Sequence, residues 1–386
     1  MRCYNFNHFA GRMWLSVAGN LQDRQHQGLK IRDGHVFRSR QQRRAPTLPV
    51  NGCDSQNFTC DYKDFVMTPL YPLRLNPALH VRVWGGRRLQ TVFHKALPTD
   101  EPYGESWEMH DTATVADGPL AGQTLGALLA TYGHDLIGPD SDPALGFPLL
   151  LKLMDSRDWL SVQVHPNDDQ AGELEGEPRG KTEAWIVLDA QPGARLVIGV
   201  RPGTSRSDLA EAIRQNTLER LLVYANITAG DVLLNTAGAI HALGPGLLIY
   251  EIQQSSDTTY RLYDWGRRGL DGEPRDLHIE KGLAVANLDT LPEIKRTARD
   301  DSPLVEMVRC PYFTTVQHRL SGETAALDTG GRRFHVLTAL EGQAAITWGG
   351  QQTVMPPGQS VLIPACLGEY TLSGPARVLR SFQTLD

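Results

Sequence analysis

The chain has 386 residues, of which 41% are hydrophobic and 21% charged, and its formal net charge is −6. This is the composition of an ordinary globular protein, and the length is sufficient for two domains. The acidic balance argues against a nucleic-acid partner, and no apolar run is long enough to span a membrane.

Residues 1–66 differ from the rest of the chain, because they hold ten Lys or Arg, five Asp and no Glu. We expect a disordered extension, or one that is absent because translation begins at Met67; a transit peptide and a basic nucleic-acid-binding arm are the alternatives. The five cysteines form no CxxC pair, which favours free thiols and a cytoplasmic protein.

A first folded domain is predicted over residues 67–288. Alternating or apolar segments at 80–84, 104–109 and 147–154 predict strands, and Thr124 is placed to cap a helix over 125–132. Between 204 and 224 the apolar spacing becomes helical, which predicts a small helical insert.

Four polar residues in this domain form a candidate metal site. In a strand over residues 161–165, Ser161, Gln163 and His165 share one face. Glu183 opens the next apolar strand, and His241 follows a later one. Together, Gln163, His165, Glu183 and His241 offer two nitrogens and two oxygens, a set that suits zinc or another borderline divalent ion.

Residues 289–303 read as a linker, and residues 304–386 as a second β domain with short strands separated by Gly and Pro turns. Residues 357–365 repeat the pattern of residues 229–237. Because no histidine in this copy corresponds to His241, we expect a second barrel without metal.

Four motifs carry a resemblance to a known family: SVQVHP at 161–166, GKTEAW at 180–185, GAIHA at 238–242 and EIQQSSDTTYRLYD at 251–264. In this order they resemble the type I mannose-6-phosphate isomerases, in their short bacterial form. The resemblance implies a mainly β chain with a cupin (double-stranded β-helix) catalytic barrel. It also implies interconversion of mannose 6-phosphate and fructose 6-phosphate.

The resemblance also implies roles for individual residues. Gln163, His165, Glu183 and His241 match ligands of one Zn²⁺ per chain, although cobalt, manganese or iron would also suit them. The remaining matches are Arg261 near the reacting carbons, Lys181, Glu251 and Asp257 as polar neighbours, and Ser161 and Arg267 as phosphate contacts. An ion-pair network at the barrel mouth is the alternative for Glu251, Asp257 and Arg267. Some family members carry a histidine where this chain has Gly180, so no imidazole base is available there.

The chemistry of aldose–ketose isomerisation agrees with this set. A proton moves between C1 and C2 through a cis-enediolate, which requires a proton carrier and a stabiliser of the developing charge. Arg261 suits the second role, and the sequence leaves the first open among Lys181, Glu251 and Asp257. A cupin dioxygenase and a non-catalytic sugar-binding cupin are the alternatives. We expect a monomer or weak homo-oligomer with a sugar-phosphate substrate.

Overall fold

Two seven-stranded antiparallel sheets dominate the computed structural model, which describes residues 67–289, 291–297 and 301–385. The prediction of a mainly β chain is confirmed. The predictions for residues 1–66 lie outside the described residues.

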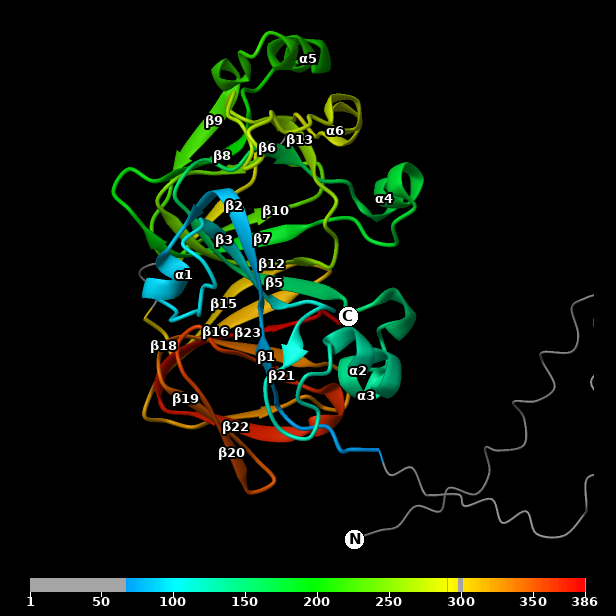
Figure 1. Cartoon of the computed structure of the whole chain (residues 1–386), viewed down its shortest axis with the longest axis vertical. Helices are drawn as coiled ribbons and strands as arrows, with labels where there is room; N and C mark the ends of the chain where they lie inside the picture. The colour runs from blue at the N-terminus through cyan, green and yellow to red at the C-terminus, as the bar shows by residue number, and fades with distance from the viewer. Residues whose placement is uncertain (1–66, 290, 298–300, 386) are drawn as a thin grey trace, which may run out of the picture. The chain divides into compact units, whose positions relative to one another are not determined.

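The first large sheet belongs to the barrel that carries the candidate metal ligands (Figure 1). Its strands, in spatial order, are β14 (Ile294–Arg296), β10 (Asp231–Asn235), β7 (Glu183–Ala190), β12 (Leu247–Gln254), β5 (Leu149–Ser156), β2 (Ala78–Gly86) and β3 (Tyr103–Met109). Two smaller sheets accompany it: β11 (Ala242–Leu243), β8 (Arg195–Val200) and β9 (Leu222–Asn226) form one, and β13 (Tyr260–Tyr263) and β6 (Val162–Val164) form the other.

The strand period of two decides which side chains of β12 face the barrel interior. Tyr250 and Ile252 join a core shared with the second large sheet, whereas Leu247 and Ile249 join a core with residues of β8 and β11. Glu251 therefore faces the barrel interior with Ile249, since alternate residues share a face.

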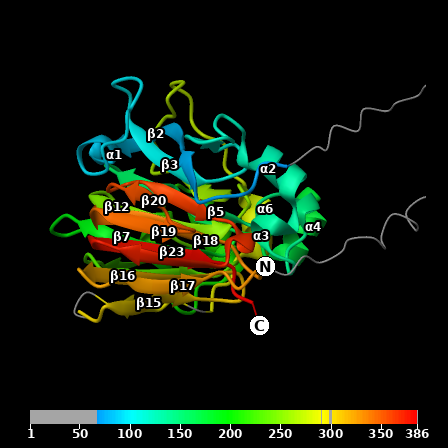
Figure 2. The same cartoon turned by 90° about the horizontal axis from the view of Figure 1, so that it is seen from below.

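The second large sheet contains, in order, β15 (Leu304–Arg309), β16 (Thr314–Ser321), β23 (Pro375–Phe382), β18 (His335–Gly342), β21 (Ser360–Ile363), β1 (Leu73–Asn76) and β4 (Thr114–Val115). Figure 2 shows β18, β23 and β16 running beside one another. A four-stranded sheet completes the C-terminal barrel with β17 (Ala325–Asp328), β22 (Glu369–Ser373), β19 (Ala344–Trp348) and β20 (Gln351–Met355).

The division into two domains at residues 289–303 stays a prediction. Strands from both sides of it are paired in one sheet. Leu73 of β1 pairs with Leu362 of β21, so a strand from the beginning of the described chain lies in the C-terminal sheet. Within the expected linker, β14 pairs with β10. The C-terminal sheet thus includes a strand from the beginning of the described chain, and the first sheet includes one from the expected linker.

The helices of the described chain are short. They are α1 (Arg88–Thr91), α2 (Leu125–Tyr132), α3 (His134–Ile137), α4 (Asp168–Glu175), α5 (Arg206–Arg214) and α6 (Ile279–Val285), with 3₁₀ turns η1 (Pro143–Leu145), η2 (Leu218–Arg220) and η3 (Ala365–Leu367). No helix in the described part of the chain is long and apolar enough to cross a membrane.

Two local helix predictions have different outcomes. The cap at Thr124 is confirmed, because its side chain accepts a hydrogen bond from the Ala127 amide. The prediction of helix as far as residue 224 is wrong at its end: after α5 and η2, residues 222–226 form β9, where Leu222 pairs with Val200. Pairing with β8 overrides the local helical spacing.

Candidate active site

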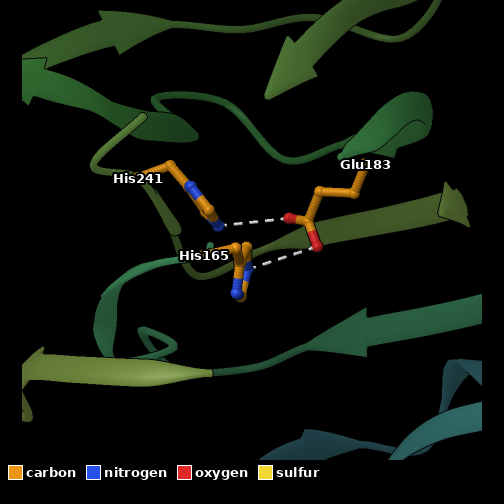
Figure 3. Close-up of side chains that lie close together, drawn as sticks. All are labelled: His165, Glu183 and His241. Carbon is orange, nitrogen blue, oxygen red and sulfur yellow. Dashed lines mark ion pairs between the residues drawn. The ribbon is translucent and has the colours of Figure 1, made fainter. Parts of the chain in front are cut away.

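Three side chains converge inside the first barrel (Figure 3). His165 directly follows β6, Glu183 opens β7, and His241 directly precedes β11. The Glu183 carboxylate oxygens lie 3.5 Å from His165 Nε2 and 3.1 Å from His241 Nε2. One ligand atom from each residue lies within 4.8 Å of the others, so a single ion could contact all three.

Hydrogen bonds fix both imidazole rings with the same nitrogen inward. His165 Nδ1 lies 3.0 Å from the Thr258 carbonyl oxygen, and His241 Nδ1 lies 2.9 Å from that of Ala239. Since a carbonyl can only accept, each Nδ1 donates and each Nε2 presents a lone pair. A carbonyl behind a ligating imidazole is the usual support of a metal-binding histidine.

The inward-facing atoms of His165, Glu183 and His241 form no hydrogen bonds within the described residues. Both Nε2 atoms and both Glu183 oxygens are buried without a hydrogen-bond partner among the described residues. Burial, with Lys181 nearby, lowers the pKa of His165 to about 3, so the ring is neutral at pH 7. Burial raises the pKa of Glu183, but the nearby Lys181 ammonium lowers it more, so the pKa of this carboxyl lies well below its ordinary value. Lone pairs facing a carboxylate repel it unless a cation lies between them, so this donor set fits a divalent metal.

Gln163 lies beside this triad. Its backbone amide and carbonyl exchange two hydrogen bonds of 3.0 Å with those of His241. Its side chain lines the adjoining cavity. The structure therefore brings all four predicted ligands to one end of the barrel.

A cavity of about 570 Å³ opens beside these ligands. It is large enough for a sugar phosphate. Most of the predicted substrate-site residues line it, namely Ser161, Lys181, Glu251, Asp257 and Arg261, together with the predicted ligand Gln163.

Lys181 and Arg261 enter the cavity from different elements. Lys181 Nζ lies 3.4 Å from a Glu183 oxygen and 3.5 Å from Thr259 Oγ1, which places an ammonium beside the candidate metal ligands. Arg261 pairs with Gln163 across β13 and β6 and donates from Nη1 to the Asp276 carbonyl at 2.7 Å. Its Nε is buried without a hydrogen-bond partner in the described chain.

Lys152 is a site residue that our sequence reasoning missed. Its Nζ lies 2.7 Å from Glu251 and 2.8 Å from Gln253 Oε1, and Trp185 Nε1 donates to Glu251 at 2.7 Å. Burial raises the pKa of Glu251, whereas Glu251 and Glu105 raise the pKa of Lys152 against the opposing effect of burial. A lysine inside the apolar run 149–154 was the signal available in the sequence.

Arg267 is not brought to the cavity. Its guanidinium lies 2.8 Å from Asp264 and 3.4 Å from Asp158 and also donates to the Trp159 carbonyl, and these partners hold it outside the cavity lining. Arg275, which the sequence did not single out, binds the same Asp264 from the cavity side, with Nε 2.7 Å from Oδ2. The barrel-mouth ion-pair network anticipated for Arg267 is therefore present.

Comparison with known proteins agrees with this geometry. Residues 72–181 match the family described as phosphomannose isomerase type I, catalytic domain, and residues 305–383 match the mannose-6-phosphate isomerase cupin domain. The mannose-6-phosphate isomerase of Streptococcus mutans is 33% identical over 316 residues, covering 80% of this chain and 98% of that protein. The chain belongs to the type I mannose-6-phosphate isomerases.

Two proteins of Bacillus subtilis extend the comparison. The mannose-6-phosphate isomerase ManA is 32% identical over 317 residues, covering 80% of this chain and 98% of ManA. A crystal structure of a mannose 6-phosphate isomerase from that organism superposes with a TM-score of 0.73 at 30% identity, covering 80% of this chain and 99% of the other. The resemblance to this isomerase family and the predicted cupin fold, with a second cupin domain at the C-terminus, are confirmed.

Proposed function

We propose that this type I isomerase interconverts D-mannose 6-phosphate and D-fructose 6-phosphate with a divalent metal, zinc by preference, held by Gln163, His165, Glu183 and His241. The convergence of His165, Glu183 and His241 beside a cavity lined by Lys181 and Arg261 carries the proposal. Two nitrogen and two oxygen donors suit zinc, and cobalt, manganese and iron are the alternatives.

The metal, when bound, would supply a Lewis acid that polarises the sugar oxygens at C1 and C2. Arg261 would stabilise the negative charge that develops on these oxygens, since its guanidinium remains cationic and faces the same cavity. Its bond to the Asp276 carbonyl holds the side chain in place.

Proton transfer would fall to Lys181, Glu251 or Asp257, all of which line the cavity. Burial raises the pKa of Glu251, which makes this carboxyl more basic and so a better proton acceptor. Changing Lys181 to Met, Glu251 to Gln and Asp257 to Asn one at a time separates them. The carrier's variant should lose about 10² or more in kcat with normal metal content, and three variants of near-normal kcat would contradict the assignment.

The phosphate group would be bound at the cavity mouth by Ser161 and Arg275, which both line it. Arg267 then acts indirectly, because it holds Asp264, the carboxylate that binds Arg275. The direct contact expected for Arg267 is replaced in this proposal by that positioning role.

The rival functions account for less of the site. A cupin dioxygenase would use the metal ligands but leave Lys181 and Arg261 without a role, and a non-catalytic sugar-binding cupin would leave the ligand cluster without one. Neither is favoured by the comparisons, in which the curated relatives reported above carry the name mannose-6-phosphate isomerase. We place the enzyme in the cytoplasm as a monomer or weak homo-oligomer; the free thiols of Cys310 and Cys366 suit a reducing compartment.

A coupled assay with mannose 6-phosphate tests the proposal, using the full chain and a version that begins at Met67. We expect turnover by both, loss of turnover after treatment with a chelator, and recovery on addition of Zn²⁺. Undiminished activity after complete metal removal would refute the metal dependence. A folded, metal-loaded enzyme without turnover would refute the function.

A further inference from the structure

The strand registers of the two barrels can be superimposed position by position. In the first barrel Asn235 of β10 pairs with Glu183 of β7, and in the second Ile363 of β21 pairs with His335 of β18. The repeat that relates β21 to β10 places Ile363 at the position of Asn235. His335 therefore occupies the position of the predicted metal ligand Glu183.

The neighbouring strand gives a second correspondence. Glu251 of β12 pairs with Trp185 of β7, two residues beyond Glu183. Arg380 of β23 pairs with Leu337 of β18, two residues beyond His335. An arginine thus stands in the second barrel where the first has the cavity glutamate.

A second histidine lies on the same interior face. His318 of β16 pairs with Val378 of β23, and Val378 and Leu337 belong to the core of the second barrel. Arg380 is two residues from Val378, so it points to the same side and is the diagonal neighbour of His318.

These residues form what we call the Arg380 cluster: Arg380, Arg333, His318, His335 and Tyr370. Three of its polar side chains are almost completely buried: His318 is 3% exposed, and His335 and Tyr370 are each 2% exposed. His335 Nδ1 lies 2.8 Å from the Tyr370 hydroxyl. Arg333 and Arg380 are half-buried, at 5.3 and 5.0 Å from the centroid of the Phe382 ring.

The cluster has donors that nothing in the described structure satisfies. His318 Nε2 and Arg380 Nε are buried without a hydrogen-bond partner among the described residues. Neither Arg380 nor Arg333 forms an ion pair within residues 67–289, 291–297 and 301–385, and the nearby Asp140 pairs with Arg332 at 2.9 Å. Half-buried guanidinium groups without a counter-ion are costly, so the arrangement lacks an anion.

We propose that the Arg380 cluster is an anion site, which binds a phosphate group, free or as a phosphomonoester, at the place in the second barrel that corresponds to the active site. Guanidinium forks match the geometry of phosphate oxygens, and the His318 N–H can donate to the same anion. Because His335 and Tyr370 share one hydrogen bond, one of the two, either the His335 N–H or the Tyr370 O–H, is left to donate to it as well. Burial and the charge of Arg380 lower the pKa of His318 to about 4, and burial with Arg380 and Arg333 lowers that of His335 to about 3. Both rings are therefore neutral at pH 7 and can each donate one N–H. This inference does not depend on the isomerase activity.

Histidine NMR of the full chain tests the site, because ring resonances report on each location separately. On titration with inorganic phosphate we expect the resonances of His318 and His335 to shift together, whereas those of His165 and His241 report the active site. Arg380→Gln should weaken the affinity seen at His318 by about tenfold or more. Arg377→Gln is the matched control, because it removes the same charge from the same strand but from an arginine paired with Glu341; its affinity should equal that of the wild type.

A second titration with glycerol 3-phosphate identifies the source of the phosphate group, and whichever probe shifts His318 at lower concentration is the preferred form. If Arg380→Gln does not fold, Arg333→Gln replaces it, since Arg333 precedes β18 and is half-buried. Unshifted His318 and His335 resonances in the folded wild type with both probes would overturn the proposal. Equal phosphate affinity in the wild type and both cluster variants would overturn it as well, since the outcome is then an adventitious ion only.

Discussion

The Glu183 carboxylate faces two imidazole nitrogens that have no other partner in the described chain. Replacing His241 by Ala removes one of these donors, and we expect the variant to lose both bound metal and isomerase activity. Metal analysis and the coupled assay measure the two effects. His94→Ala is the control, because it also removes a histidine, but one that is exposed. A His241 variant with full metal and activity would contradict the assignment.

Arg261 lines the cavity, and its Nε is buried without a hydrogen-bond partner among the described residues. Arg261→Ala should keep its metal and lose about 10² in kcat, on the scale of a lost oxyanion donor. Steady-state kinetics and metal content check this together. Arg268→Ala, which removes an exposed arginine a few residues away, should leave kcat unchanged. An unaltered kcat in Arg261→Ala would remove this residue from the chemistry.

The sequence predicted the candidate metal ligands better than the charged residues around the cavity. Gln163, His165, Glu183 and His241 could be found because strand alternation and motif order constrain them. Lys152 and Arg275 were missed, and Arg267 lies outside the cavity lining, because ion pairs depend on which carboxylate a fold brings near. Asp264 lies three residues from Arg267 and eleven from Arg275, and sequence distance does not reveal that it binds both.

Strand β12 connects the two large sheets through Tyr250. Its hydroxyl lies 2.8 Å from Ser381 Oγ on β23, in a fully buried position. Tyr250→Phe should lower the free energy of unfolding by about 1–2 kcal/mol, because it removes one buried hydrogen bond and leaves Ser381 with Thr315 as partner. Urea unfolding measures this; Tyr224→Phe, at a half-buried tyrosine, is the control, and equal stability of both variants would show that the link contributes nothing.

The β2–β3 pair contains a carboxylate whose ionisation is linked to folding. Glu105 on β3 is bound by Arg82 of β2 and by Trp107, each at 2.8 Å. Burial alone would raise the pKa of Glu105, but the charges of Lys152 and Arg82 lower it from 4.5 to about 2.

Because the folded-state pKa of Glu105 is depressed, its contribution to stability is complete above pH 4.5 and is lost as pH falls toward 2. We expect Glu105→Gln to be less stable than the wild type at pH 7 by about 1–3 kcal/mol. The difference should shrink with acidification, which urea unfolding at a series of pH values would reveal. A difference that stays constant from neutral pH to the acid limit of folding would contradict the linkage.

At the level of elements, alternation and apolar runs were sufficient for β2, β3 and β5, and capping residues for α2. They failed at β9, where Leu222 follows helical spacing but pairs with Val200. These local patterns also did not indicate that β1 belongs to the C-terminal sheet, because β1 and its partner β21 are far apart in the sequence.

The metal should stabilise the whole barrel, because its proposed ligands come from segments around β6, β7 and β11. A ligand that binds only the folded state raises the unfolding temperature by mass action. We expect chelation to lower Tm and Zn²⁺ to restore it, as measured by scanning calorimetry. The His241→Ala variant is the control, since its Tm should not respond to chelator; equal responses in both proteins would indicate that the chelator acts elsewhere.

The pairing of β1 with β21 has a consequence for synthesis on the ribosome. Residues 73–76 leave the ribosome long before their partner at 360–363. Until then β1 has no β21 to pair with, and the C-terminal sheet cannot complete its order from β18 to β4. An unpaired strand edge is a template for association with other chains. During that interval the nascent chain is exposed to misassembly, and a chaperone that covers β1 would be expected to raise the yield of folded enzyme.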